Sequence, residues 1–133
     1  MEHLQEESKV EVNSNAIKVL IADDDPMFLD TITQLVQTMG FTPQQAKDGW
    51  EAVETFQAGA GSFSLVILDV EMPRLGGIEA AMKIREMDPA AKVILCSGRT
   101  RADVWKAKPN GFILKSFLFI DLRRVVQTLL LEI

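Results

Sequence analysis

The sequence predicts an α/β domain with a doubly wound, five-stranded parallel sheet, and two observations support this fold class. Short apolar runs, typical of strands buried on both faces, alternate with stretches of helical periodicity, which is the pattern of β-α-β units. Four of the runs end at polar side chains: Asp23 and Asp24, Asp69, Ser97, and Lys115. Because the carboxyl ends of parallel strands meet at one sheet edge, where open α/β sheets bind ligands, these side chains are candidates for one shared site.

The first predicted unit consists of a strand over residues 17–22 and a helix over residues 26–39. Pro26 suits the first helical turn, where a backbone N–H is not needed. Apolar residues recur at helical spacing, and Gly40 is expected to end the helix as its C-cap. The pattern therefore predicts a buried strand that leads directly into a helix with one buried face.

The second predicted strand, residues 42–46, contains Pro43, which cannot donate a hydrogen bond to a neighbouring strand. We therefore expect this strand at an edge of the sheet. A helix over residues 50–58 follows it, and Asp48 is expected to be the turn or cap residue before that helix.

The third predicted strand ends at Asp69 and leads through a loop rich in proline and glycine, residues 72–77, into a helix over residues 78–87. The fourth strand ends at Ser97. These two strand ends supply the second and third polar groups of the candidate site.

The stretch from residue 99 to residue 110 has the weakest pattern, and it predicts at best one short helix near residues 102–106. A fifth strand over residues 112–114 and a last helix over residues 119–132 follow. The last helix repeats apolar residues at helical spacing, which predicts one buried side.

Composition predicts a single domain, residues 16–133, after a flexible lead-in over residues 1–15. Hydrophobic residues make up 47% of the chain, which is enough for a core. The net charge of −5, without a basic cluster, argues against nucleic-acid binding. The single cysteine, Cys96, excludes an internal disulfide, and no apolar stretch is long enough to span a membrane. We therefore expect a cytoplasmic protein.

The predicted strand ends bring together groups suited to phosphoryl chemistry. Three carboxylates, from Asp23, Asp24 and Asp69, would repel one another unless a hard cation such as Mg²⁺, which prefers oxygen ligands, relieved the repulsion. An aspartate can itself be the nucleophile and form an aspartyl phosphate. Lys115 would supply a positive charge to phosphate oxygens, and Ser97 a hydroxyl donor.

Four motifs, in this order, resemble the receiver domain of two-component response regulators, the CheY-like superfamily. The motifs are VLIADDDP at 19–26, LVILDVEMP at 65–73 with two glycines at 76–77, VILCSG at 93–98, and FILK at 112–115. Each motif lies at a predicted strand end, and the resemblance extends over nearly the whole ordered chain.

The resemblance implies that Asp69 is the phosphoacceptor. It also implies that Asp24 binds Mg²⁺ directly, that Asp23 binds it through water, and that Asp69 and the backbone carbonyl of Glu71 complete the protein's ligands. The implied strand order is 2-1-3-4-5, and this order places the strand with Pro43 at an edge, as its proline independently predicts.

The resemblance further implies that Ser97 and Lys115 contact the phosphoryl group and that Ser97 and Phe112 are switch residues; for Phe112, a plain core phenylalanine is the alternative. The donor would be a histidine kinase or a phosphotransfer protein. An unknown protein target would bind the face formed by the fourth helix, the fifth strand and the fifth helix of the family. The implied role is a signalling switch rather than an enzyme, with neither nucleic acid nor membrane as a partner.

Two features depart from the family pattern. Ser116 stands where the family usually has proline, so the preceding peptide bond is expected to be trans, with a shift of Lys115. The segment between Ser97 and Lys115 is a few residues shorter than usual, so the fourth helix is expected to be shortened or irregular. These departures support a second hypothesis, an interaction module that works without phosphorylation.

A third hypothesis is a Mg²⁺-dependent phosphatase with Asp69 as nucleophile and Glu71 as general acid, although the small chain leaves no cap to exclude water. Other polar residues have simpler interpretations. Asp25 is expected to start the first helix, and a solvated loop is favoured for Arg99 and Arg101 over contact with an acidic partner.

Overall fold

The structure is a computed structural model that describes residues 17–130, so the predicted lead-in and the last residues of the final helix lie outside the described part. Its strands form one parallel sheet in the order β2-β1-β3-β4-β5. The strands are β1 (Lys18–Ala22), β2 (Thr42–Ala46), β3 (Phe63–Asp69), β4 (Val93–Ser97) and β5 (Gly111–Leu114). The doubly wound fold and the strand order are confirmed.

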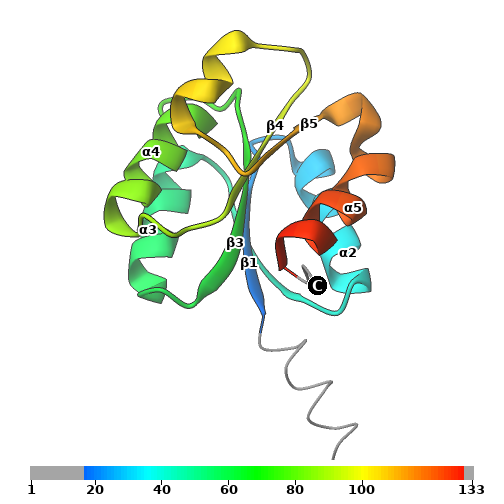
Figure 1. Cartoon of the computed structure of the whole chain (residues 1–133), viewed down its shortest axis with the longest axis horizontal. Helices are drawn as coiled ribbons and strands as arrows, with labels where there is room; N and C mark the ends of the chain where they lie inside the picture. The colour runs from blue at the N-terminus through cyan, green and yellow to red at the C-terminus, as the bar shows by residue number, and fades with distance from the viewer. Residues whose placement is uncertain (1–16, 131–133) are drawn as a thin grey trace, which may run out of the picture.

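Two layers of helices cover the sheet, α3 and α4 on one face and α2 and α5 on the other (Figure 1). The α-helices are α2 (Pro26–Thr38), α3 (Gly49–Gly59), α4 (Gly77–Met87) and α5 (Leu118–Leu130). Two 3₁₀ helices, η1 (Ala102–Ala107) and η2 (Lys115–Phe117), flank β5. The predicted boundaries of these elements differ from the observed ones by one residue at most positions.

Alternation along the central strands divides the core into two clusters. Leu20 and Ala22 of β1 belong to the cluster under α3 and α4, whereas Val19 and Ile21 belong to the cluster under α2 and α5. All four side chains are buried. Burial on both faces explains why the central strands read as continuous apolar runs.

The edge position of β2 follows from its sequence. Pro43 lies opposite Val19 in the register of β1 and β2, and the other side of β2 has no strand partner within residues 17–130. Most β2 side chains are exposed or half-buried. The edge position predicted from the proline is therefore confirmed.

Side-chain caps fix the starts of the two helices that follow β1 and β2. The Asp25 carboxylate accepts a hydrogen bond from the Met27 amide at 3.0 Å, and the Asp48 carboxylate accepts one from the Glu51 amide at 2.8 Å. Both residues are N-caps, as predicted. Gly40 has a positive φ of 89°, which suits the turn that follows α2.

The segment between β4 and β5 contains only the 3₁₀ helix η1, which confirms the predicted shortening of the fourth family helix. Arg85 of α4 forms hydrogen bonds with residues that flank η1. Its guanidinium donates to the carbonyls of Ala91 and Lys108, both at 2.9 Å, and to Asn110 Oδ1 at 2.7 Å. Charged hydrogen bonds from one arginine thus stabilise a connection that is too short for a full helix.

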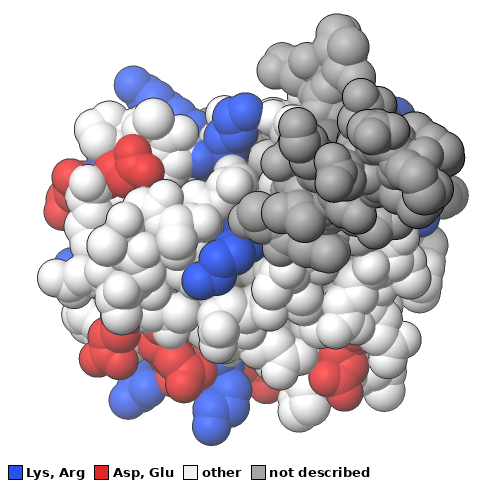
Figure 2. Space-filling view, turned by 90° about the horizontal axis from the view of Figure 1, so that it is seen from below, with Lys and Arg blue, Asp and Glu red and all other residues white. Residues whose placement is uncertain are grey.

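Figure 2 shows the end of the molecule from which β1 starts, opposite the carboxyl edge of the sheet. Basic and acidic side chains are interspersed among uncharged ones on the visible part of this surface. Charge on it is therefore mixed rather than gathered into one basic patch.

Within residues 17–130, none of the helices combines the length and the apolar character needed to cross a membrane.

Candidate functional site

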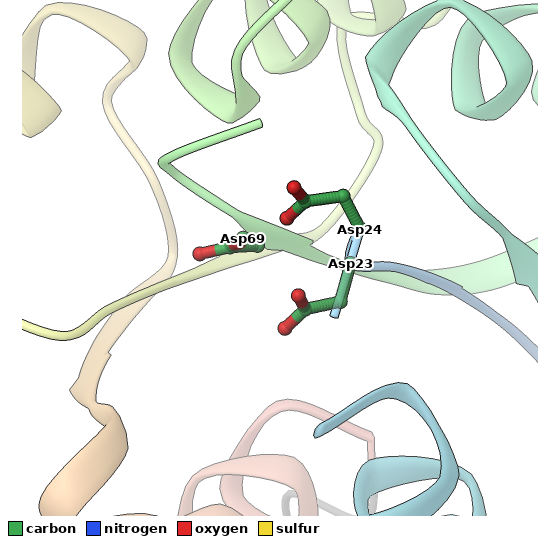
Figure 3. A group of neighbouring side chains, drawn as sticks. All are labelled: Asp23, Asp24 and Asp69. Carbon is green, nitrogen blue, oxygen red and sulfur yellow. The ribbon is translucent and has the colours of Figure 1, made fainter. Parts of the chain in front are cut away.

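Three carboxylates meet where β1 and β3 end. Asp23 and Asp24 follow β1, and Asp69 is the last residue of the adjacent β3. One oxygen from each lies within 4.8 Å of the others, and all three carboxylates point toward the same space (Figure 3). Since Ala22 pairs with Leu68, Asp23 and Asp69 come next along two neighbouring strands and lie side by side. The sequence-predicted acids are thus brought together.

Lys115 reaches the same cluster from the end of β5. Its Nζ lies 3.0 Å from Asp23 Oδ2 and 3.3 Å from Asp69 Oδ1, and 4.4 Å from the ring centroid of Phe28. No peptide bond in the described chain is cis, so the bond before Ser116 is trans as predicted. The trans bond still lets the Lys115 ammonium contact both acids.

The surroundings of Asp69 disfavour its charged form. Burial, together with the nearby charge of Asp23, raises the pKa of Asp69 to about 7, and the Lys115 ammonium only partly offsets this. Burial alone would lower the pKa of Lys115, but its contacts with Asp23 and Asp69 raise it overall. The site therefore favours a positive charge beside Asp69.

The acids fit a divalent cation. Asp23 Oδ2 is buried and makes no hydrogen bond; its contact with Lys115 is an ion pair without hydrogen-bond geometry. Backbone amides hold two of the other oxygens: the Asp25 amide donates to Asp23 Oδ1 at 2.9 Å, and the Glu71 amide donates to Asp69 Oδ1 at 3.4 Å. An all-oxygen donor set with one exposed member, Asp24, matches the preference of Mg²⁺ for carboxylates and retained waters.

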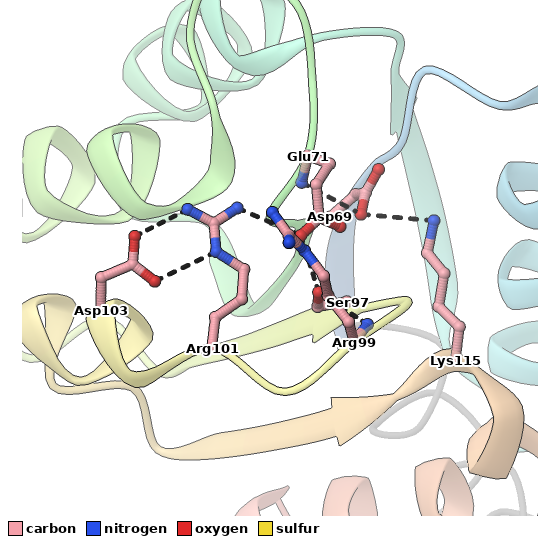
Figure 4. A network of polar contacts seen from close by, with 7 residues as sticks. All are labelled: Asp69, Glu71, Ser97, Arg99, Arg101, Asp103 and Lys115. Atoms are coloured by element: carbon pink, nitrogen blue, oxygen red, sulfur yellow. Dashed lines mark hydrogen bonds and ion pairs between the residues drawn. The ribbon is translucent and has the colours of Figure 1, made fainter.

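Ser97, at the end of β4, is fully buried, and its hydroxyl forms hydrogen bonds within the protein. Its Oγ accepts a hydrogen bond from the Arg99 amide at 3.2 Å and donates to Glu71 Oε2 at 2.8 Å (Figure 4). The Glu71 side chain therefore points to Ser97 rather than joining the three acids. Burial would raise the pKa of Glu71, but hydrogen bonds from Ser97 and Arg101 lower it overall.

Arg101 corrects one interpretation of the sequence. A solvated loop was the favoured prediction, but the Arg101 guanidinium is half-buried and pairs with Glu71 Oε2 at 3.1 Å and with Asp103 at 2.7 Å. The Arg99 side chain is exposed, as expected for a residue of a solvated loop. Asp103 is two residues from Arg101, but no local pattern in residues 99–103 signals the contact with Glu71, because it depends on how β3 and β4 place their loops.

Phe112, the predicted switch residue, is half-buried on β5. It packs against the core cluster under α3 and α4, and its ring centroid lies 6.4 Å from that of the exposed Trp105 in η1. The position touches both the core and η1, so the geometry is compatible with either a switch aromatic or a plain core residue.

Comparison with known proteins identifies the family. The sequence model of the response regulator receiver domain matches residues 19–127, which is most of the chain. The chain belongs to the response regulator receiver domain family. This receiver domain shares 38% identity over 85 residues with the two-component response regulator ARR22 of Arabidopsis thaliana, an alignment that covers 64% of the chain and 60% of ARR22. It therefore spans less than two thirds of that relative.

Other relatives match over more of their length. The chemotaxis protein CheY of Listeria monocytogenes is 34% identical over 106 residues, covering 76% of the receiver domain and 87% of CheY. The crystal structure of the response regulator TrrA of Thermotoga maritima in complex with Mg²⁺-BeF has 34% identity and a TM-score of 0.79, covering 86% of this chain and 99% of TrrA. A second crystal structure contains TrrA in complex with the histidine kinase ThkA, with 32% identity, a TM-score of 0.75, and coverage of 86% and 98%.

Proposed function

We propose that this receiver domain is a phosphoacceptor switch of a two-component phosphorelay and that Asp69 accepts the phosphoryl group with Mg²⁺. The observation that carries the proposal is the convergence of three carboxylates and one ammonium at the carboxyl edge of the sheet. The crystal structure of the response regulator TrrA in complex with Mg²⁺-BeF supports it, because that related protein binds Mg²⁺.

In the proposed reaction, a carboxylate oxygen of Asp69 attacks the phosphorus of a phosphohistidine on the donor protein. The new bond joins phosphorus to the Asp69 oxygen, the phosphorus–nitrogen bond breaks, and the imidazole leaves with the electron pair and is protonated by solvent. Lys115 Nζ, already 3.3 Å from Asp69 Oδ1, would neutralise charge on the phosphoryl oxygens. In this proposal the receiver domain is the acceptor in a signalling switch rather than an enzyme with a turnover of its own.

The proposed metal ligands are Asp24, Asp69 and the Glu71 carbonyl, with Asp23 bound through water. When bound, Mg²⁺ supplies positive charge that offsets the charge of the phosphoryl group and of the acids. The chain's own part is to fix the carboxylates of Asp23 and Asp69, which the amides of Asp25 and Glu71 do by hydrogen bonding.

The proposed donor is a histidine kinase or phosphotransfer protein, and the complex of TrrA with ThkA supports this class of partner. The proposed output is a change in the affinity of the face formed by η1, β5 and α5 for a protein target, through a population shift between two states. We place this activity in the cytoplasm.

The test is incubation with acetyl phosphate and Mg²⁺, read by intact mass. The wild-type protein should gain one phosphoryl group only in the presence of Mg²⁺, and Asp69→Ala should gain none. Asp103→Ala, which removes an acid outside the three-carboxylate cluster, should still be modified. A gain that does not need Mg²⁺, or that persists in Asp69→Ala, would overturn the proposal.

A phosphorylation-independent interaction module is the second candidate, and one observation favours it. The Ser97 hydroxyl, which a phosphoryl group would need as a donor, already donates its hydrogen bond to Glu71. Partner affinity that is the same for wild type and Asp69→Asn, with and without acetyl phosphate, would support this candidate. The phosphatase hypothesis gains no support, since the Glu71 carboxylate is engaged by Ser97 and Arg101 rather than free to act as an acid.

A further inference from the structure

We infer that Glu71 and Arg101 are positioning residues that hold the Ser97 hydroxyl away from the phosphoryl position and connect its release to η1. The inference rests on the proposed function, which it deepens with a regulatory contact. It starts from a continuous chain of polar contacts, drawn in Figure 4, that runs from Ser97 through Glu71 and Arg101 to Asp103.

The first step concerns the single proton of Ser97. A serine hydroxyl has one O–H and can donate to one acceptor at a time. That proton is directed at Glu71 Oε2, 2.8 Å away, while Ser97 Oγ is fixed from the other side by the Arg99 amide. A phosphoryl group on Asp69 would therefore compete with Glu71 for the same proton.

The second step concerns what holds Glu71 in place. The Glu71 side chain is 39% exposed, so apolar packing does not fix its orientation. Arg101 donates to the same Oε2 atom at 3.1 Å, so this one oxygen accepts from both Ser97 and Arg101. Arg101 thus stabilises Glu71 in the position in which Glu71 accepts the hydrogen bond of Ser97.

The third step connects Arg101 to η1. Arg101 is the residue directly before η1, and its guanidinium makes a two-point contact with Asp103 in the first turn, at 3.1 and 2.7 Å. The opposite side of the same guanidinium contacts Glu71. A planar guanidinium has the donors for both contacts, which an ammonium could not reproduce with the same geometry.

The consequence is a two-way coupling. When Ser97 turns to a phosphoryl oxygen, Glu71 loses one of its donors, and its hold on Arg101 and on the start of η1 weakens. By thermodynamic reciprocity, a partner that stabilises the released form of η1 must also favour the phosphorylated form of the site. Trp105, exposed in η1, lies on the surface that this release would alter.

The first experiment needs neither metal nor phosphodonor. Amide hydrogen exchange over residues 102–108 is compared in EDTA for wild type, Arg101→Met and Arg101→Lys. Both variants should exchange faster in this segment, Arg101→Met by more. The matched control is Arg124→Met, which removes an arginine from an exposed pair with Asp121 on α5 and should leave this segment unchanged.

The second experiment measures the affinity for BeF₃⁻ in the presence of Mg²⁺. Since Arg101→Met and Glu71→Met each weaken or remove the competing acceptor of Ser97, both should bind BeF₃⁻ more tightly, by between about two- and tenfold. Arg99→Met, which removes a nearby charge with no ion-pair partner among residues 17–130, should not reproduce this gain. In wild type, BeF₃⁻ should accelerate exchange over residues 102–108.

The outcomes separate the two proposals. If wild type binds no BeF₃⁻ but Arg101→Met loosens η1, the proposed function fails and the contact between Arg101 and η1 stands. If BeF₃⁻ binds but Arg101→Met matches Arg124→Met in hydrogen exchange and Arg99→Met in BeF₃⁻ affinity, the inference is overturned and the proposed function stands. Thermal melting of each variant shows whether it is folded, and Arg101→Lys, which keeps the charge, serves if Arg101→Met does not fold.

Discussion

Asp69 carries most of the chemistry of this receiver domain, and its environment sets the cost of its charge. The side chain is buried between Asp23 and Lys115, one of which opposes its ionisation while the other favours it. Burial and the charge of Asp23 outweigh the effect of Lys115, and they raise the pKa of Asp69 to about 7. A cation beside Asp69 would reverse this balance, so acceptor and metal site depend on each other.

This raised pKa predicts how the stability of the metal-free protein depends on pH. Between about pH 4 and pH 7 the folded state binds a proton on Asp69 that the unfolded state, with an ordinary pKa of 3.8, has released. The stabilisation is complete below pH 4 and is lost as the pH rises through 7, by up to about 4 kcal/mol. Urea unfolding in EDTA should give this loss for wild type, and Asp69→Asn should lack it. Equal pH dependence in both proteins would show that Asp69 titrates normally.

The acids and Lys115 could be predicted from the sequence because each directly follows an apolar run, and parallel strands place such residues at one edge. The contacts of Arg101 could not be predicted in this way. Arg101 lies in a loop without periodicity, and its partners, Glu71 and Asp103, include a residue thirty positions away. Ser97 was predicted to belong to the site, but the direction of its hydroxyl depends on the side chain of Glu71.

The loop between β3 and α4 illustrates how an element start positions the site. A Cβ on Gly77, the first residue of α4, would overlap the carbonyl group of Asp69. The glycine therefore lets the start of the helix approach the backbone of the phosphoacceptor. Helix propensity alone favours alanine at such a position, so packing and propensity make opposite predictions.

Gly77→Ala should destabilise the protein by about 1 to 3 kcal/mol, because either Asp69 or the start of α4 must move. Gly98 provides a matched control: a Cβ there would meet no atom within 4 Å, and Gly98→Ala should stay within about 0.5 kcal/mol of wild type. Urea unfolding measures both. A Gly77→Ala protein as stable as Gly98→Ala would mean that the close approach to Asp69 has no structural role.

For the connection through η1, the sequence predicts the secondary structure but not the contacts that hold it in place. The weak pattern over residues 99–110 correctly predicted a short, irregular helix, because a few residues cannot form a full helical connection. The contacts of Arg85, which donates to the backbone carbonyls of Ala91, Ala107 and Lys108 and to Asn110 Oδ1, could not be predicted, since backbone carbonyls carry no sequence signal.

The topology of the whole chain makes the site possible. The order β2-β1-β3-β4-β5 places the strands that end at Asp23, Asp69, Ser97 and Lys115 as consecutive neighbours, and β2, which contributes no group to the site, lies at the edge. Residues nearly a hundred positions apart thus share one small volume. The order followed from family resemblance, and the edge position of β2 also followed from Pro43.

Mg²⁺ should stabilise the folded protein, since the three carboxylates are gathered only in that state. At a Mg²⁺ concentration ten times Kd, the gain should be about 1.4 kcal/mol, and EDTA should reverse it. Asp24→Asn should need more Mg²⁺ for the same rise in Tm, whereas Asp30→Asn, on the exposed side of α2, should behave as wild type. An equal response of the Asp24 and Asp30 variants would exclude the acid cluster as the binding site.

The most direct test maps the phosphoryl group to a residue. After reaction with acetyl phosphate and Mg²⁺, borohydride reduces an aspartyl phosphate to homoserine, and peptide mass spectrometry locates the change. Conversion at position 69 alone, absent in EDTA, is the predicted result. Conversion at another aspartate, or no conversion in a protein that binds Mg²⁺, would contradict the assignment of Asp69 as the acceptor.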